Sequence, residues 1–147
     1  MPASDLQNIP PEELTGKVVC IEDEPISLAI VEELLKQFPK VQLLTATTGA
    51  EGVRLVRAER PDFVLLDMHL PDTSGLEVVR QLNEDIASWG LRVTILTGDT
   101  LTMDVIKALS LGAFEYWVKP IEASVLESGL RRALTARKAH PGRRFPH

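Results

Sequence analysis

The chain alternates between short, almost wholly apolar segments and longer segments in which apolar residues recur every three or four positions. The short segments are rich in valine, isoleucine and leucine, with few polar residues at their centres. Such runs are typical of β-strands that are buried on both faces. They predict five strands, at Lys17–Ile21, Val41–Thr45, Asp62–Asp67, Leu91–Thr97 and Phe114–Val118.

The intervals between these strands, and the segment after the last one, carry apolar stripes with helical spacing. The stripes lie at residues 28–38, 53–56, 76–86, 105–111 and 125–134. Two helix starts have capping-box spacing, because a hydroxyl precedes a carboxylate by three residues. Pro25 suits a first helical turn, and a glycine follows two of the helical patterns, where a helix can end in a left-handed residue. The capping pairs are Thr48 with Glu51 and Ser74 with Glu77, and the two glycines are Gly90 and Gly112.

Alternation of strand and helix predicts an α/β fold with a doubly wound, five-stranded parallel sheet and helices on both faces. In such sheets the ligand site lies beyond the carboxyl ends of the strands. We expect a flexible extension over residues 1–15, one domain over residues 16–139 and a basic flexible tail over residues 140–147.

Composition excludes several classes of protein. No apolar run approaches the ~18 residues that span a bilayer, and the acidic N-terminus lacks the pattern of a signal peptide. The single cysteine, Cys20, cannot form an internal disulfide, so we expect a cytoplasmic protein with Cys20 as a small buried residue. Residues 131–147 carry a charge of +6 and the rest of the chain −11. The negative charge of residues 1–130 disfavours direct contact with nucleic acid. We interpret the basic residues 131–147 as a solvent-exposed helix end.

Charged and hydroxyl-bearing residues follow the predicted strands where each strand ends. Glu22, Asp23 and Glu24 follow the first strand, and the third ends in Asp67. The fourth ends in Thr97, and the fifth is followed by Lys119. At ~5 Å and an effective dielectric near 20, each pair of carboxylates repels by roughly 3 kcal/mol. An oxygen-rich cluster of this kind favours Mg²⁺, with Mn²⁺ as an alternative, over a soft metal.

The order and spacing of these residues resemble those of response-regulator receiver domains of two-component signalling. The segments that carry the resemblance are VVCIEDEP, VLLDMHLPDTSG, TILTGDT and GAFEYWVKP, and it covers about residues 16–138. It implies a flavodoxin-like sheet with strand order 2-1-3-4-5. It also implies that Asp67 accepts a phosphoryl group, while Glu22, Asp23, Asp67 and the backbone carbonyl of His69 hold the metal ion.

The resemblance assigns roles to residues of the last two strands as well. Lys119 and the Thr97 hydroxyl would contact the phosphoryl group, and Gly98 would leave room for it. Tyr116 would turn inward as Thr97 moves, whereas Trp117 points to the other face of its strand and packs. The bond before Pro120 would be cis. Glu24, at the rim or capping a helix, is a weaker metal candidate.

The implied function is a phosphoacceptor switch in a two-component or phosphorelay pathway, and not an enzyme. The donor would be a histidine kinase or a histidine phosphotransfer protein. The output would be a protein target or a homodimer, reached through the face made by the fourth predicted helix, the fifth strand and the fifth helix. No membrane partner is expected.

Other functions remain as alternatives. The chain could be a receiver fragment of a larger regulator or hybrid kinase, or a Mg²⁺-dependent aspartyl phosphohydrolase. Aspartyl phosphohydrolases commonly carry a second aspartate two residues after the nucleophile, and this chain has His69 at that position, which argues against the phosphohydrolase. His69 could still alter the rate at which water removes the phosphoryl group from Asp67. A flavin carrier would need a hydroxyl- and glycine-rich loop where Glu22–Glu24 stand, and no residues remain for a helix-turn-helix domain.

Overall fold

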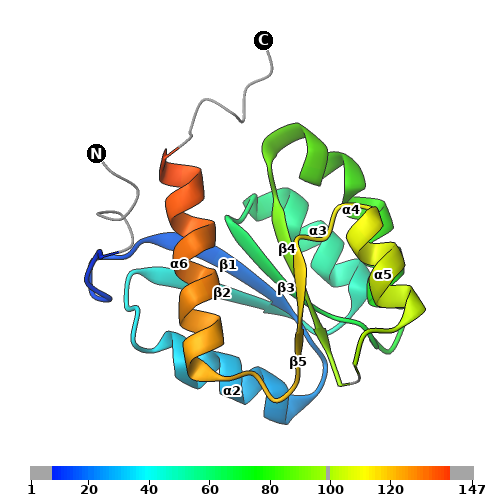
Figure 1. Cartoon of the computed structure of the whole chain (residues 1–147), viewed down its shortest axis with the longest axis horizontal. Coiled ribbons are helices and arrows are strands. Elements are labelled where there is room, and N and C mark those ends of the chain that lie inside the picture. The colour runs from blue at the N-terminus through cyan, green and yellow to red at the C-terminus, as the bar shows by residue number, and fades with distance from the viewer. Residues whose placement is uncertain (1–7, 99, 140–147) are drawn as a thin grey trace.

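The computed structural model describes residues 8–98 and 100–139, and it contains a parallel sheet with helices on both faces (Figure 1). The strand order is β2-β1-β3-β4-β5, which confirms the predicted doubly wound fold and the order 2-1-3-4-5. In chain order, the elements are β1 Gly16–Ile21, α2 Pro25–Leu35, β2 Val41–Ala46, α3 Gly49–Glu59, β3 Phe63–Asp67, α4 Gly75–Trp89, β4 Arg92–Thr97, α5 Met103–Ser110, β5 Glu115–Val118 and α6 Ala123–Ala139.

The helices begin where the capping residues predict. The hydroxyl of Thr48 accepts a hydrogen bond from the Glu51 N–H (3.1 Å) at the start of α3. Ser74 does the same for α4 through the Glu77 N–H (3.2 Å). Each bond satisfies a backbone donor that the first helical turn leaves without a partner. Helix α2 begins at Pro25, which confirms that prediction too.

Two glycines lie just past helices, as predicted. Gly90 follows α4 with φ 75°, and Gly112 lies two residues beyond the end of α5 with φ 127°. Both angles fall in the region that side chains with a Cβ rarely adopt. These turns therefore depend on glycine.

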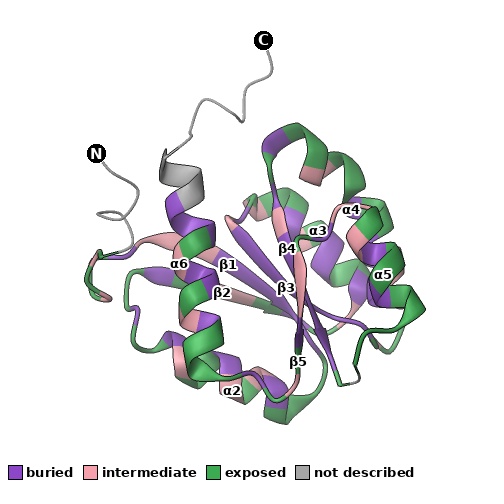
Figure 2. Cartoon of the chain, in the orientation of Figure 1, coloured by how far each residue is buried: buried purple, intermediate pink, exposed green. Residues whose placement is uncertain are grey.

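The sheet separates two apolar cores, because successive side chains of a strand point to opposite faces. Helices α3, α4 and α5 cover one face, onto which Val19, Val64 and Ile95 point. Helices α2 and α6 cover the other, and both cores are buried in Figure 2. In the described part of the chain, no helix combines the length and the apolar character needed to cross a bilayer.

Residues 8–15 pack onto the core that α2 and α6 cover. Leu14 is fully buried there, and Ile9 lies against the same cluster. The backbone carbonyl of Ile9 accepts a hydrogen bond from the Arg131 guanidinium on α6. Packed residues therefore begin before the predicted domain boundary at residue 16, whereas residues 1–7 and the predicted tail 140–147 lie outside the described residues.

Thr94 offers a test of the core. Its side chain is fully buried in β4, and its hydroxyl has no hydrogen-bond partner among the described residues. Because an unpaired buried hydroxyl carries a desolvation cost, we expect Thr94→Val to raise the free energy of unfolding by about 1 kcal/mol. Urea unfolding measures the change.

Thr135→Val is the control for this prediction. Thr135 is also buried, but its hydroxyl donates a hydrogen bond to the Arg131 carbonyl (2.6 Å). Its replacement should therefore give no gain in stability. Equal gains from both variants would show that added apolar character, and not the unpaired hydroxyl of Thr94, decides the result.

Candidate functional site

Three carboxylates gather where β1 and β3 end. The two strands are neighbours, with Ile21 opposite Leu66, so the residues that follow them lie side by side. One oxygen each of Glu22, Asp23 and Asp67 lies within 4.8 Å of the other two. Glu22 and Asp67 are buried and Asp23 is exposed. The predicted convergence of these side chains is therefore present in the structure.

Lys119 reaches this cluster from the loop after β5. Its Nζ lies 2.7 Å from Oε1 of Glu22 and 3.3 Å from Oδ1 of Asp67. The backbone N–H of Lys119 donates a hydrogen bond to the Thr97 carbonyl (2.8 Å), which fixes the lysine to the end of β4. The peptide bond between Lys119 and Pro120 is cis, as the resemblance implied.

The site holds more negative than positive charge. Burial and the neighbouring Asp67 raise the pKa of the Glu22 carboxyl to about 7. Burial by itself would lower the pKa of Lys119, but its contacts with Glu22 and Asp67 outweigh that effect and raise it. Lys119 therefore stays charged, and its single positive charge faces three carboxylates.

The donor set suits a small divalent cation. The ligand atoms offered are carboxylate oxygens, which hard cations such as Mg²⁺ and Mn²⁺ prefer. Oε1 of Glu22 is buried and forms an ion pair with Lys119, but no described group donates it a well-aligned hydrogen bond. The residues present therefore fit a metal of the predicted type.

Cys20 lies in the strand that precedes Glu22 and serves as core packing, as predicted. Burial and the neighbouring Glu22 raise the pKa of its thiol, so this sulfur stays protonated.

Glu24 lies at the rim of the site, outside the cluster of three carboxylates. Its side chain accepts a hydrogen bond from the Ser27 hydroxyl and lies 3.9 Å from Nζ of Lys119. Glu24 precedes α2, but its side chain does not cap the helix backbone. The structure therefore places Glu24 at the rim of the site, which is one of the two positions predicted for it.

Thr97 and Tyr116 lie on neighbouring strands. Thr97, the last residue of β4, is buried. Tyr116 is half-buried, pairs with Ile95, and packs against the core that α3, α4 and α5 cover. Trp117 lies on the opposite face, with its ring 6.1 Å from that of Phe63, which confirms its predicted packing role.

The loop after Asp67 approaches that residue closely. The Gly75 N–H donates to the Met68 carbonyl (2.8 Å), and His69 pairs with Ser74 across the loop. A Cβ at Gly75 would lie 2.7 Å from the carbonyl oxygen of Asp67, a contact that real Cβ atoms do not make. The first residue of α4 must therefore be a glycine, because it lies against the backbone of Asp67. The imidazole of His69 is exposed.

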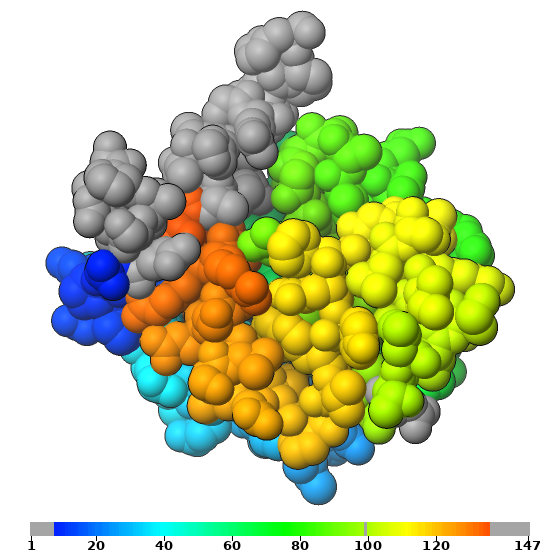
Figure 3. All heavy atoms as spheres, viewed as in Figure 1, coloured from blue at the N-terminus to red at the C-terminus, as the bar shows by residue number. Residues whose placement is uncertain are grey.

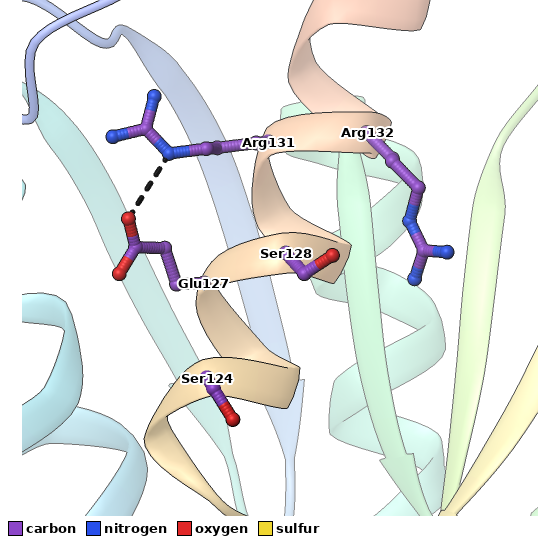
Figure 4. A pocket seen from close by; sticks show the side chains of 5 residues that line it. All are labelled: Ser124, Glu127, Ser128, Arg131 and Arg132. Atoms are coloured by element: carbon purple, nitrogen blue, oxygen red, sulfur yellow. Dashed lines mark hydrogen bonds and ion pairs between the residues drawn. The ribbon is translucent and has the colours of Figure 1, made fainter. Parts of the chain in front are cut away.

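Two other surfaces lie away from the acidic cluster. A pocket of about 370 Å³ on the outer side of α6 is lined by polar residues, including Arg131 paired with Glu127 (3.1 Å), and Arg132 (Figure 4). None of its lining residues belongs to the acidic cluster. Helices α6 and α5 and strand β5 form one continuous face of the molecule (Figure 3). Among its exposed apolar residues are Ile106, Phe114, Val118 and Val125.

The sequence did not predict the role of Asp72, in the loop between β3 and α4. The carboxylate of Asp72 accepts hydrogen bonds from the N–H groups of Gly49 (2.8 Å) and Ala50 (3.0 Å). A Pro-Asp pair before the capping residue Ser74 signals a turn. No local pattern connects Asp72 to a helix that begins 23 residues earlier in the chain.

Comparison with known proteins identifies the family. The model of the response regulator receiver domain matches residues 18–131. The chain therefore belongs to the response-regulator receiver domain family, whose members are signalling domains of two-component systems.

Among curated relatives, the transcriptional regulatory protein AfsQ1 of Streptomyces coelicolor is 34% identical over 113 residues. The match covers 77% of this chain and 48% of AfsQ1, so the chain spans about half the length of that relative. The protein PilH of Pseudomonas aeruginosa is 30% identical over 111 residues, covering 76% of this chain and 91% of PilH.

Solved structures agree on the fold. A receiver domain from Clostridium thermocellum has a TM-score of 0.73 and 31% identity, covering 84% of this chain and 97% of its own. The receiver domain of the sensor histidine kinase PA1611 of Pseudomonas aeruginosa has a TM-score of 0.72 and 24% identity, covering 82% and 98%. That structure has a magnesium ion coordinated in its active-site cleft.

Proposed function

We propose that Asp67 accepts a phosphoryl group from the phosphohistidine of a histidine kinase or a histidine phosphotransfer protein. The observation that supports this most strongly is the position of the Asp67 carboxylate. It is buried between two acids that can share a dication and the Lys119 ammonium, 3.3 Å away. A carboxylate placed among positive charges can attack a phosphorus atom without repelling the phosphoryl oxygens.

In the proposed step, one oxygen of Asp67 forms a bond to phosphorus as the bond from phosphorus to the imidazole nitrogen breaks. The product is an acyl phosphate, and the imidazole leaves with the electron pair of the broken bond. Lys119 would turn from Glu22 toward a phosphoryl oxygen, and the Thr97 hydroxyl would donate to another. A mass measurement after incubation with acetyl phosphate and Mg²⁺ tests this step directly.

Mg²⁺ is the proposed cofactor, with Mn²⁺ as a substitute. Glu22, Asp23, Asp67 and the backbone carbonyl of His69 would hold it, and it would supply positive charge beside the phosphoryl oxygens. Two observations support the proposal: the oxygen-only cluster, and the magnesium ion bound by the fold neighbour PA1611.

Phosphorylation would be read out through Thr97 and Tyr116. Movement of the Thr97 side chain toward the phosphoryl group would free space near Tyr116, which is half-buried on the neighbouring strand. An inward turn of Tyr116 would change the face formed by α5, β5 and α6 (Figure 3), whose exposed apolar residues suit a protein target or a second copy. As AfsQ1 extends well beyond its matched part, a place within a larger regulator belongs to this proposal.

The assignment of Asp23, and not Glu24, to the acidic cluster leads to a prediction about metal binding. Asp23→Asn should weaken Mg²⁺ binding by about tenfold or more, because it removes one of the clustered carboxylates. Glu24→Gln should change it much less, because Glu24 lies outside that cluster and contacts Ser27. Isothermal titration calorimetry of both variants gives the order of the two effects. The reverse order would mean that the cluster is assigned to the wrong acids.

A further inference from the structure

Asp72 joins the loop between β3 and α4 to a different helix. Its Oδ1 accepts from the Gly49 N–H (2.8 Å), and its Oδ2 accepts from the Ala50 N–H (3.0 Å). These donors belong to the first residues of α3, where the helix dipole favours a negative charge. Both oxygens of one carboxylate are thus used to hold the loop against the helix.

The packing around this contact is close. A Cβ at Gly49 would lie 2.3 Å from Cγ2 of Thr73, the residue next to Asp72, so only glycine allows the loop to come this near. Helix α3 also has its own cap, because Thr48 accepts from the Glu51 N–H. Asp72 is therefore an additional acceptor at this helix end, supplied by the loop that follows Asp67.

The loop is tied internally as well. The Leu70 N–H donates to the Thr73 carbonyl (3.1 Å), and the Gly75 N–H donates to the Met68 carbonyl (2.8 Å). The Met68 N–H donates to the Leu96 carbonyl of β4 (3.1 Å). Because these bonds leave residues 68–75 little freedom, a displacement at Asp72 would shift the backbone at residues 68–70.

We infer that Asp72, through its two bonds to the start of α3, is a positioning residue for the backbone that follows Asp67. This backbone includes His69, whose carbonyl is one of the proposed ligands of the metal ion. The inference rests on the proposed function, in which that carbonyl binds Mg²⁺. A site whose ligands are held this way loses affinity when the supporting bond is removed, even though no ligand is changed.

The test compares Asp72→Asn with Thr48→Ala in the full chain. Calorimetric titration with Mg²⁺, without a phosphoryl donor, should give a Kd about tenfold weaker for Asp72→Asn than for the wild type. Thr48→Ala removes the other acceptor at the same helix end but leaves the loop contact intact. Its Kd should stay within about twofold of the wild-type value. Both variants should unfold at a lower temperature than the wild type.

Each outcome is decisive. An unchanged Kd in Asp72→Asn would overturn the inference, as would an equal loss of affinity in both variants, which would assign the effect to the stability of α3. Gly49→Ala, which pushes on the same contact from the helix side, should also weaken Mg²⁺ binding, and an unchanged Kd there would count against the inference. Failure of the wild type itself to bind Mg²⁺ would overturn the proposed metal site first.

Discussion

Incubated with acetyl phosphate and Mg²⁺, the wild-type chain is expected to gain the mass of one phosphoryl group, and Asp67→Asn is expected to gain none. The reason is chemical: an amide oxygen is a far weaker nucleophile than a carboxylate oxygen, so the asparagine cannot replace Asp67 in the attack on phosphorus. Intact-mass spectrometry measures the adduct. Treatment with hydroxylamine, which cleaves acyl phosphates, should remove it.

Asp62→Asn is the matched control for this experiment. Asp62 precedes the same strand, β3, at its opposite end, and its carboxylate accepts a hydrogen bond from the Lys17 N–H (2.8 Å). An asparagine there can still accept that bond, so the variant should fold and take up the phosphoryl group as the wild type does. An adduct on Asp67→Asn, or its absence from the wild type, would contradict the proposed phosphoacceptor.

The sequence predicted the site where backbone geometry alone places the residues. Strands of a parallel sheet end at one edge, so Asp67, Thr97 and Lys119 had to approach the residues after β1 once five buried strands were recognised. The apolar runs that lead to the ends of β1 and β3 are continuous, which made these ends easy to locate. The roles of these residues stay predictions, because proximity alone does not show chemistry.

The resemblance made Glu24 the weakest metal candidate of three consecutive acids, but the residue pattern alone could not show which of the three points inward. The Glu22 N–H bonds to the Ala46 carbonyl of β2 (2.9 Å), which extends the strand pairing by one residue and turns this side chain inward. Asp23, the next residue, is exposed, and Glu24 contacts Ser27 at the rim. The inward direction of Glu22, and therefore its ion pair with Lys119, depends on where the sheet ends, and strand boundaries are the least certain part of a sequence-based prediction.

Contacts between side chains from distant segments were also beyond the sequence. Leu14 and Ile9 precede the first apolar run, and two apolar residues carry too little periodicity to indicate packing. Asp72 looks like a turn former, and its partner amides at Gly49 and Ala50 carry no signal at all because every helix start offers such donors. Tertiary structure decides these contacts.

Replacement of Lys119 by methionine is expected to lower the free energy of unfolding of the metal-free protein by about 3 kcal/mol, the lower end of the range for a broken buried ion pair. Lys119 neutralises Glu22 and Asp67, whose side chains are 0% and 7% exposed. Without it their repulsion is uncompensated, although Glu22, with a pKa raised to about 7 chiefly by its burial, can relieve part of it by taking up a proton.

Mg²⁺ should restore much of the stability that Lys119→Met loses. A dication that binds only the folded state adds stability in proportion to the logarithm of its concentration over Kd, and the more negative site of the variant should bind it more tightly. Urea unfolding of wild type and variant, each in EDTA and in excess Mg²⁺, measures the two differences. Lys17→Met is the control. It removes a partly exposed lysine that pairs with Glu59 (2.9 Å) at the start of β1, the end of the strand opposite the acidic cluster, and it should show no such dependence on Mg²⁺. If the cost of losing Lys119 were the same with and without Mg²⁺, the carboxylates it neutralises would not be those that hold the metal ion.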